Sequence, residues 1–169
     1  RQQDDLLRMV YRLTKEIDPP RPCIDTSGVS HVETDLYDVH DYDQNPETFA
    51  ARYDALRTSG TFEDPHYADR QRYDGKKPVF LSEYGGTGLS LKGGSWSYGS
   101  AAKDCEDFCK RYEGLTNALM KNPEICGMCY TQLYDVEQEQ NGLYTYERQP
   151  KIDIARIREI NTKKAAIEE

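Results

Sequence analysis

The feature that most constrains the fold is the alternation, along the whole chain, of short apolar runs with longer segments of helical periodicity. The short runs predict strands at 21–25, 34–42, 78–82 and 124–133. Apolar residues three or four positions apart predict helices at 6–17, 45–56, 101–121 and 153–169. A strand that is followed by a helix usually pairs in parallel with the next strand. The order therefore predicts the α/β class, with a parallel sheet covered by helices.

Four strand–helix units amount to half of a (β/α)8 barrel, which typically needs about 250 residues. The chain has 169 residues, enough for one domain with a core of its own. We expect a single domain over residues 1–169. Its sheet is either half of such a barrel or an open sheet of about four or five strands.

Composition excludes two classes of partner. The net charge of −8 at pH 7 argues against a nucleic-acid partner, because proteins that bind nucleic acids present basic surfaces. The sequence has no apolar run of about eighteen residues and therefore predicts no membrane span. Thirteen tyrosines against four phenylalanines make the aromatic content polar. A tyrosine offers a flat apolar face and a hydroxyl, which suits a wet site, although partly exposed packing accounts for most of them.

The five cysteines are Cys23, Cys105, Cys109, Cys126 and Cys129, and an odd number argues against a disulfide framework. The pair at 105 and 109 would share one face of a helix, whereas the CxxC pair would point to opposite faces of a strand. That arrangement disfavours a zinc or redox site. We expect small buried apolar residues in a reducing compartment such as the cytoplasm.

Polar residues stand where three of the predicted strands end. The second strand ends in HDYD (40–43), the third in EY (83–84) and the fourth in YTQ (130–132). Because the carboxyl ends of parallel strands form the functional face of such folds, a histidine, a tyrosine and a carboxylate would converge there. A tyrosine hydroxyl can orient a nucleophilic carboxylate. The glycines at 85, 86 and 88 let the backbone approach a ligand closely.

Each candidate also has a purely structural interpretation. Glu83 could be a solvated carboxylate that pairs with a lysine, and His40 a rim histidine that touches no ligand. Trp96, the only tryptophan, could stack on a sugar face or anchor its own loop. The acidic run at 135–139 suits a hard cation poorly because it lacks an ordered coordination loop, and we expect it to be solvated.

Three long motifs together resemble glycoside hydrolase family two. They are IDTSGVSHVETDLYDVHDYDQNPE (24–47), KPVFLSEYGG (77–86) and CYTQLYDVEQEQNGLYTYERQPK (129–151). The resemblance is to the β-galactosidase and β-glucuronidase branch, and it covers essentially the full chain. It implies the catalytic (β/α)8 barrel, of which this chain would carry the last four strands, preceded by the helix after strand four.

The resemblance implies a role for each candidate residue. Glu83 matches the catalytic nucleophile at the end of strand seven, and Tyr42 would donate a hydrogen bond to it. His40 would line the sugar subsite, and Trp96 would add a wall. Tyr130 would lie under the sugar, where the family often has a tryptophan. No metal and no cofactor is implied.

The resemblance also implies an absence. The acid/base glutamate of the family follows an asparagine at the end of strand four, which would precede Arg1. We expect the parent protein to be a retaining, β-galactosidase-like enzyme that acts on β-linked carbohydrates. The chain alone is expected to be inactive, and to self-associate or pair with the missing half-barrel. The alternatives are a carbohydrate-binding or scaffold module derived from the same barrel, and a thiol or metal module.

Overall fold

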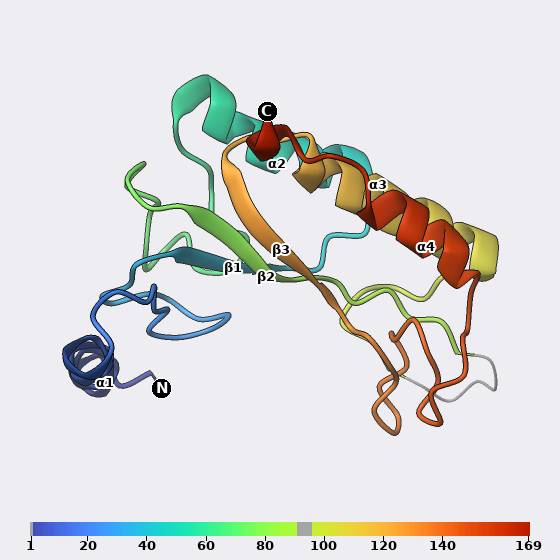
Figure 1. Ribbon diagram of the computed structural model, residues 1–169, viewed down its shortest axis with the longest axis horizontal. Helices are drawn as coiled ribbons and strands as arrows, with labels where there is room; N and C mark the ends of the chain where they lie inside the picture. The colour runs from blue at the N-terminus through green and yellow to red at the C-terminus, as the bar shows by residue number, and fades with distance from the viewer. Residues whose placement is uncertain (1, 91–95) are drawn as a thin grey trace.

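The computed structural model describes residues 2–90 and 96–169, and within these ranges it contains three strands and four α-helices (Figure 1). Their order is α1 (Asp4–Ile17), β1 (Tyr37–Asp41), α2 (Pro46–Ser59), β2 (Val79–Gly85), α3 (Cys105–Met120), β3 (Ile125–Thr131), α4 (Ile154–Asn161) and a short 3-10 helix, η1 (Ala166–Glu168). None of the helices in the described ranges is long and apolar enough to cross a membrane.

The three strands form one parallel sheet in the order β1-β2-β3. Their amino ends are aligned, because Val79 pairs with Tyr37 on one side and with Ile125 on the other. Figure 1 shows α2, α3 and α4 together on one side of this sheet. The predicted α/β class and the parallel pairing are confirmed, and the carboxyl ends of all three strands meet at one edge.

The prediction of a strand at 21–25 is wrong, because the structure has no strand there. The backbone of Cys23 pairs with Asp35 outside the sheet: Cys23 N donates to Asp35 Oδ2 at 2.9 Å, and Asp35 N donates to the Cys23 carbonyl at 3.0 Å. Pro22, next to it, has no N–H to offer to a ladder. Among the described residues, β1 therefore pairs only with β2, and the sheet has three strands where four were expected.

The main core lies between the sheet and the helices α2 and α3. Phe49 and Tyr53 of α2 and Leu115 and Leu119 of α3 are at most 1 % exposed and pack against Leu81 of β2. Each fully buried side chain of this size contributes roughly 1.5–3 kcal/mol by leaving water. These helices therefore hold β2 firmly, and its last residues are positioned by a rigid support.

A second apolar cluster lies between α3, α4 and the segment after β3. It contains Phe108 and Tyr112 of α3, Ile157 and Ile160 of α4, and Leu143. The helix α4 ends at Asn161 instead of continuing to residue 169, and α3 begins at Cys105 instead of residue 101. At the amino end of α3, the side chain of the N-cap residue Asp104 accepts a hydrogen bond from Asp107 N at 2.8 Å, which defines the start of this helix.

Burial of the cysteines was predicted wrongly in most cases. Only Cys109 is buried, Cys23 is half-buried, and the remaining three are exposed. Cys105 shares the helix face of Cys109, but it stands in the first turn of α3. Its thiol lies 3.5 Å from the Lys151 carbonyl, at the margin of the second cluster. All five are free thiols.

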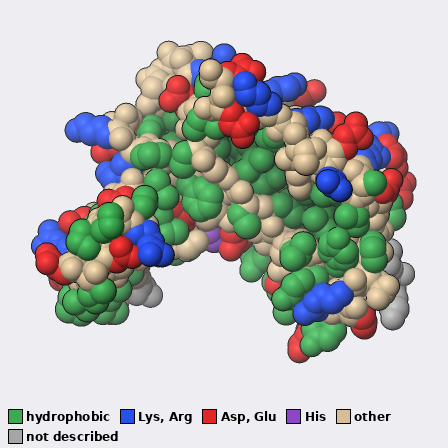
Figure 2. All heavy atoms as spheres, in the orientation of Figure 1, with side chains coloured by type: hydrophobic (Ala, Val, Ile, Leu, Met, Phe, Trp, Pro, Cys, Tyr) green, Lys and Arg blue, Asp and Glu red, His purple; other side chains and the backbone are tan. Residues whose placement is uncertain are grey.

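The helix α1 forms as its apolar periodicity predicts, yet most of its apolar face is uncovered. Tyr11 is its one buried residue. Five apolar side chains of α1 are 49–77 % exposed: Leu6, Met9, Val10, Leu13 and Ile17. Figure 1 shows α1 apart from the other helices, and in Figure 2 apolar side chains gather both on α1 and over β3.

Candidate functional site

Three of the predicted site residues lie together at the carboxyl ends of β1 and β2. The register pairs His40 with Glu83, and Tyr42 follows directly after the last residue of β1. The Tyr42 hydroxyl donates a hydrogen bond to Glu83 Oε2. His40 Nδ1 lies 3.5 Å from the same oxygen. The Glu83 side chain keeps 35 % of its surface exposed, so one tyrosine and one histidine hold a carboxylate that solvent can still reach.

The surroundings of Tyr42 keep its phenol protonated. Burial raises the pKa of Tyr42, and the hydrogen bond and the charge of Glu83 raise it further. A protonated phenol can only donate to the carboxylate oxygen it faces. The bond therefore places a neutral donor against one oxygen of the Glu83 side chain.

His40 is held from its other side by Ser27, which lies in the first motif (24–47) but to which the sequence analysis assigned no role. Its Nε2 atom shares a hydrogen bond of 2.8 Å with Ser27 Oγ, which lies 3.4 Å from Ser82 Oγ. The ring lies over Gly28, whose φ of +67° and missing side chain leave room for it. In the sequence, the TSG triplet at 26–28 is the feature that could have indicated a tight loop at this place.

Gln44 connects the ends of β1 and β2 and was also missed. Its side-chain amide donates to the carbonyls of Tyr42 and Gly85, and its oxygen accepts from Thr87 Oγ1 at 2.7 Å. One side chain therefore joins both strand ends and the loop that follows Glu83. Its long-range contacts depend on a backbone approach that no local pattern reveals.

Gly86, the first residue after β2, stands at a position where a side chain would not fit. Gly86 has a φ of +58°, and a Cβ there would lie 2.8 Å from the Tyr42 ring and 2.9 Å from Tyr98 Cβ. Its N–H donates to the Thr131 carbonyl at 2.8 Å. The chain can thus turn at this point while Tyr42 and Tyr98 occupy the space that a side chain at Gly86 would need.

Trp96 does not touch Glu83 directly in the contacts that the structure defines. Its ring is half exposed and meets the Tyr98 ring edge-on, with centroids 5.3 Å apart. Tyr98 in turn stacks on Tyr42, with centroids 4.6 Å apart and an angle of 10° between the planes. The two exposed rings extend the site outwards from Tyr42.

Tyr130 lies on the helix side of the sheet. Its ring packs against Tyr84 and Tyr112, with centroids 5.6 and 4.8 Å away, and lies beneath Gly85. Burial raises the pKa of Tyr130, so this phenol too stays neutral. The contacts of this ring are with core aromatics, and a role beneath a sugar stays a prediction.

The acidic loop after β3 is organised by a buried ion pair. Lys151 Nζ lies 2.8 Å from Asp135 Oδ1, and Gly142 N donates to the same oxygen. Asp135 is only 6 % exposed, so the expectation of a fully solvated acidic run is wrong at this residue. In the ranges 2–90 and 96–169 there is no group of three or more side chains able to hold a metal ion.

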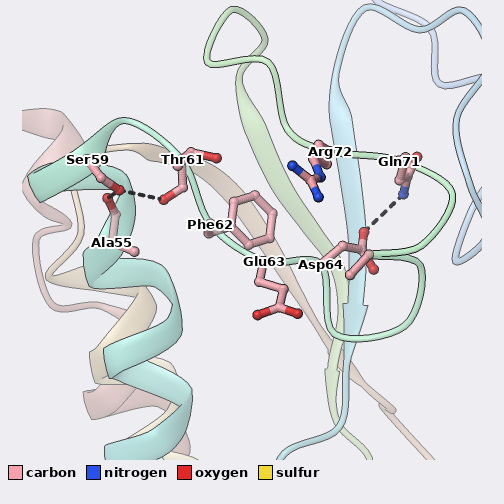
Figure 3. A pocket seen from close by; sticks show the side chains of 9 residues that line it. Ala55, Ser59, Thr61, Phe62, Glu63, Asp64, Gln71 and Arg72 are labelled. Carbon is pink, nitrogen blue, oxygen red and sulfur yellow. Dashed lines mark hydrogen bonds between the residues drawn. The ribbon is translucent and has the colours of Figure 1, made fainter.

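A separate open pocket of about 490 Å³ lies at the opposite end of the sheet (Figure 3). Its lining includes Phe62, Glu63 and Arg72, from the connector after α2. Asp64 in its wall accepts from Gln71 and from the hydroxyl of Tyr37, the first residue of β1. Its carboxylate is thus already used within the fold.

Comparison with solved structures shows a fold shared with glycosidases. The chain is similar to a β-glucuronidase from Bacteroides uniformis, with a TM-score of 0.62 and 19 % identity over 87 % of this chain and 18 % of that one. It is similar to a β-glucuronidase from Bifidobacterium dentium, with a TM-score of 0.61 and 21 % identity over 92 % of this chain and 26 % of that one. A GH2 β-galacturonidase from Eisenbergiella tayi has a TM-score of 0.64 and 15 % identity, over 96 % of this chain and 31 % of that one.

At these identities the likeness concerns the fold, and the chain spans less than a third of the length of each of these enzymes. No protein-family model and no curated protein matches the sequence. These structures share the fold that the resemblance to glycoside hydrolase family two implies, and one of them is a GH2 enzyme.

Proposed function

We propose that the chain is the part of a retaining β-glycosidase that carries the nucleophile, and that Glu83 is this nucleophile. One observation carries the proposal: the Tyr42 hydroxyl and His40 Nδ1 converge on one oxygen of Glu83, at the carboxyl end of a parallel strand. Both contacts are to Oε2, and the Glu83 side chain keeps 35 % of its surface exposed. The shared fold with β-glycosidases supports the same assignment.

In a retaining mechanism, two carboxyl groups act about 5–5.5 Å apart. Glu83 attacks the anomeric carbon and forms a bond to it, while the second group protonates the departing oxygen. Water then attacks the glycosyl-enzyme, and the second group, now a carboxylate, accepts its proton. The second group is expected from polypeptide outside these 169 residues, so the chain alone would be inactive.

The same proposal accounts for surface that the fold leaves uncovered. The apolar face of α1 is exposed, and within the described residues β1 and β3 each pair with β2 alone. Open strand edges and apolar faces of this kind favour association. We infer that the rest of a (β/α)8 barrel covers them, and that these 169 residues form half of its catalytic domain.

Covalent labelling of the full native polypeptide tests the proposal. Activated 2-deoxy-2-fluoro glycosides of galacto and glucurono configuration would be offered, and the modified peptide mapped by mass spectrometry. We expect an adduct on Glu83, because fluorine at C2 slows hydrolysis of the glycosyl-enzyme. Glu83→Gln should abolish labelling, with Glu63→Gln, an exposed glutamate of the remote pocket, as the matched control. Labelling that persists in Glu83→Gln would refute the assignment.

A carbohydrate-binding module without catalysis is the second candidate. The observation in its favour is the pair of half-exposed rings, Trp96 and Tyr98, which lie edge to face at the rim. Such rings can stack on sugars without help from a carboxylate. Titration of this chain with galactose and glucuronate, monitored by tryptophan fluorescence, separates the two: binding unchanged by Glu83→Gln, together with no adduct on the full polypeptide, would favour the module.

A further inference from the structure

We propose that Tyr98 is a positioning residue, whose ring holds Tyr42 against Glu83 and connects this pair to the loop after β3. The inference rests on the proposed glycosidase function, because it assigns Tyr98 to that same site. Neither the motif around Tyr98 nor the strand pattern assigns it a role, since it lies fifteen residues after Glu83 in a glycine-rich loop.

The first step is the support that Tyr42 needs. The strand β1 ends at Asp41, so the sheet does not hold Tyr42 in its ladder. The ring meets His40 edge-on, with centroids 6.3 Å apart, and stacks on Tyr98 with centroids 4.6 Å apart. Tyr98 thus covers one face of the ring whose hydroxyl donates to Glu83. Loss of a stacked aromatic partner should reduce the population in which the Tyr42 hydroxyl is bonded to Glu83, relative to the unbonded population, roughly three- to tenfold.

The second step is the support of Tyr98 itself. Two backbone hydrogen bonds join its neighbour Trp96 to the loop after β3: Trp96 N donates to the Gln138 carbonyl at 3.0 Å, and Gln140 N donates to the Trp96 carbonyl at 3.1 Å. The Trp96 ring then lies edge-on to Tyr98. Tyr98 is therefore fixed from two directions, by the loop after β3 and by the stack with Tyr42.

The third step extends this support to the buried ion pair between Lys151 and Asp135. Lys151 Nζ is bonded to both oxygens of Asp135, at 2.8 and 3.2 Å, and to the Gln140 carbonyl at 3.3 Å. Gln140 is the residue whose N–H reaches Trp96. A continuous series of contacts thus runs from this ion pair through Trp96 and Tyr98 to the pair at the site.

The stack itself does not depend on charge. Burial raises the pKa of Tyr98, as do the charges of Glu139 and Glu83, and the pKa of Tyr42 is raised as well. Both phenols are neutral at pH 7. Phenylalanine should therefore replace Tyr98 with little loss, whereas alanine should free the Tyr42 ring.

The experiment is a double-mutant cycle in the full native polypeptide, with the rate of Glu83 labelling and kcat/KM as readouts. We expect Tyr98→Ala to lower both roughly three- to tenfold, and Tyr98→Phe to stay within about twofold of the wild type. On a Tyr42→Phe background, Tyr98→Ala should cost little more, since the hydroxyl it positions is gone. Tyr146→Ala is the matched control, because Tyr146 is 55 % exposed and Tyr98 is 52 % exposed.

Two results would overturn the inference while the proposed function stands. One is a Tyr98→Ala variant that labels as fast as the wild type. The other is an equal loss from Tyr98→Ala with and without the Tyr42 hydroxyl, which would point to general loosening of the loop. A wild-type polypeptide that neither labels nor turns over any of the glycosides would instead overturn the glycosidase proposal, and this inference with it.

Discussion

At the scale of single residues, Gly86 shows how tightly the space around Glu83 is used. A Cβ there would meet Tyr42 and Tyr98 at 2.8 and 2.9 Å, in a backbone conformation with φ of +58°. Gly60, after α2, has a similar φ of +69°, but a Cβ there would have no atom within 4 Å. A substitution at Gly60 therefore tests the backbone strain of a positive φ alone, whereas a substitution at Gly86 adds a steric effect on the site.

We predict that Gly60→Ala lowers the free energy of unfolding by roughly 1–2 kcal/mol, through its backbone conformation alone. Gly86→Ala should cost more and should also slow labelling of Glu83, because the methyl group displaces Tyr42. Chemical denaturation and the labelling rate, measured on both variants, check this. If Gly60→Ala and Gly86→Ala lose the same stability and label at the same rate, the prediction is wrong, because Tyr42 and Tyr98 then accommodate the methyl group without loss of stability or activity.

At the scale of elements, the segment between α1 and β1 is held by a buried ion pair and not by a strand. His31 Nδ1 lies 2.7 Å from Asp25 Oδ1, and His31 Nε2 lies 2.9 Å from the Asp38 carbonyl. Burial opposes the charge on His31, but its bonds to Asp25 and Asp38 outweigh this and raise its pKa. Burial likewise opposes the charge on Asp25, whose pKa is nevertheless lowered by His31 and by two backbone N–H groups.

The direction of these shifts sets a pH window for stability. The contribution of His31 is complete below its unfolded pKa of about 6.5, and is lost as the pH rises through its higher folded pKa. The contribution of Asp25 is present above about pH 4, and is lost as the pH falls through its lower folded pKa. The pair therefore stabilises the fold most between roughly pH 4 and 6.5.

We predict that His31→Asn lowers the free energy of unfolding by about 3 kcal/mol near pH 6, because it leaves Asp25 buried without its partner. The decline of stability between pH 6 and 8 should be smaller in this variant than in the wild type. Urea titrations at several pH values measure both effects, with His66→Asn, an exposed histidine, as control. Parallel pH curves for His31→Asn and the wild type would contradict the prediction.

At the scale of the whole molecule, the uncovered face of α1 predicts association. We expect the isolated chain to form dimers or larger species at micromolar concentrations, which light scattering after size exclusion would detect. Replacing Leu13 and Ile17, which are 58 and 77 % exposed, with serine should shift the population towards monomer. Serine at Val136 and Tyr146, which are 47 and 55 % exposed, is the control pair. A monodisperse wild-type monomer over a hundredfold range of concentration would argue against the prediction.

The local pattern of the sequence was sufficient to predict the class of fold and to predict that Tyr42 and Glu83 lie at the same edge of the sheet. Periodicity located the cores of α1, α2 and α3, and a strand–helix alternation forces parallel pairing, so Tyr42 and Glu83 had to emerge at one edge. The family resemblance, not the pattern, assigned their roles. The extent of α4 and the strand at 21–25 were predicted wrongly, because pairing and helix ends depend on neighbours distant in the chain.

Only the tertiary structure decided how the site is held. Ser27 reaches His40 and Ser82, Gln44 reaches Gly85, and the stack of Tyr98 on Tyr42 joins residues that lie far apart in the sequence. Each contact requires two segments that are distant in the chain to lie close together in the folded molecule. The alternation of elements is a property of neighbours along the chain and is therefore visible in the sequence. The support of the carboxylate is a property of neighbours in space, and it exists only once packing has brought those segments together.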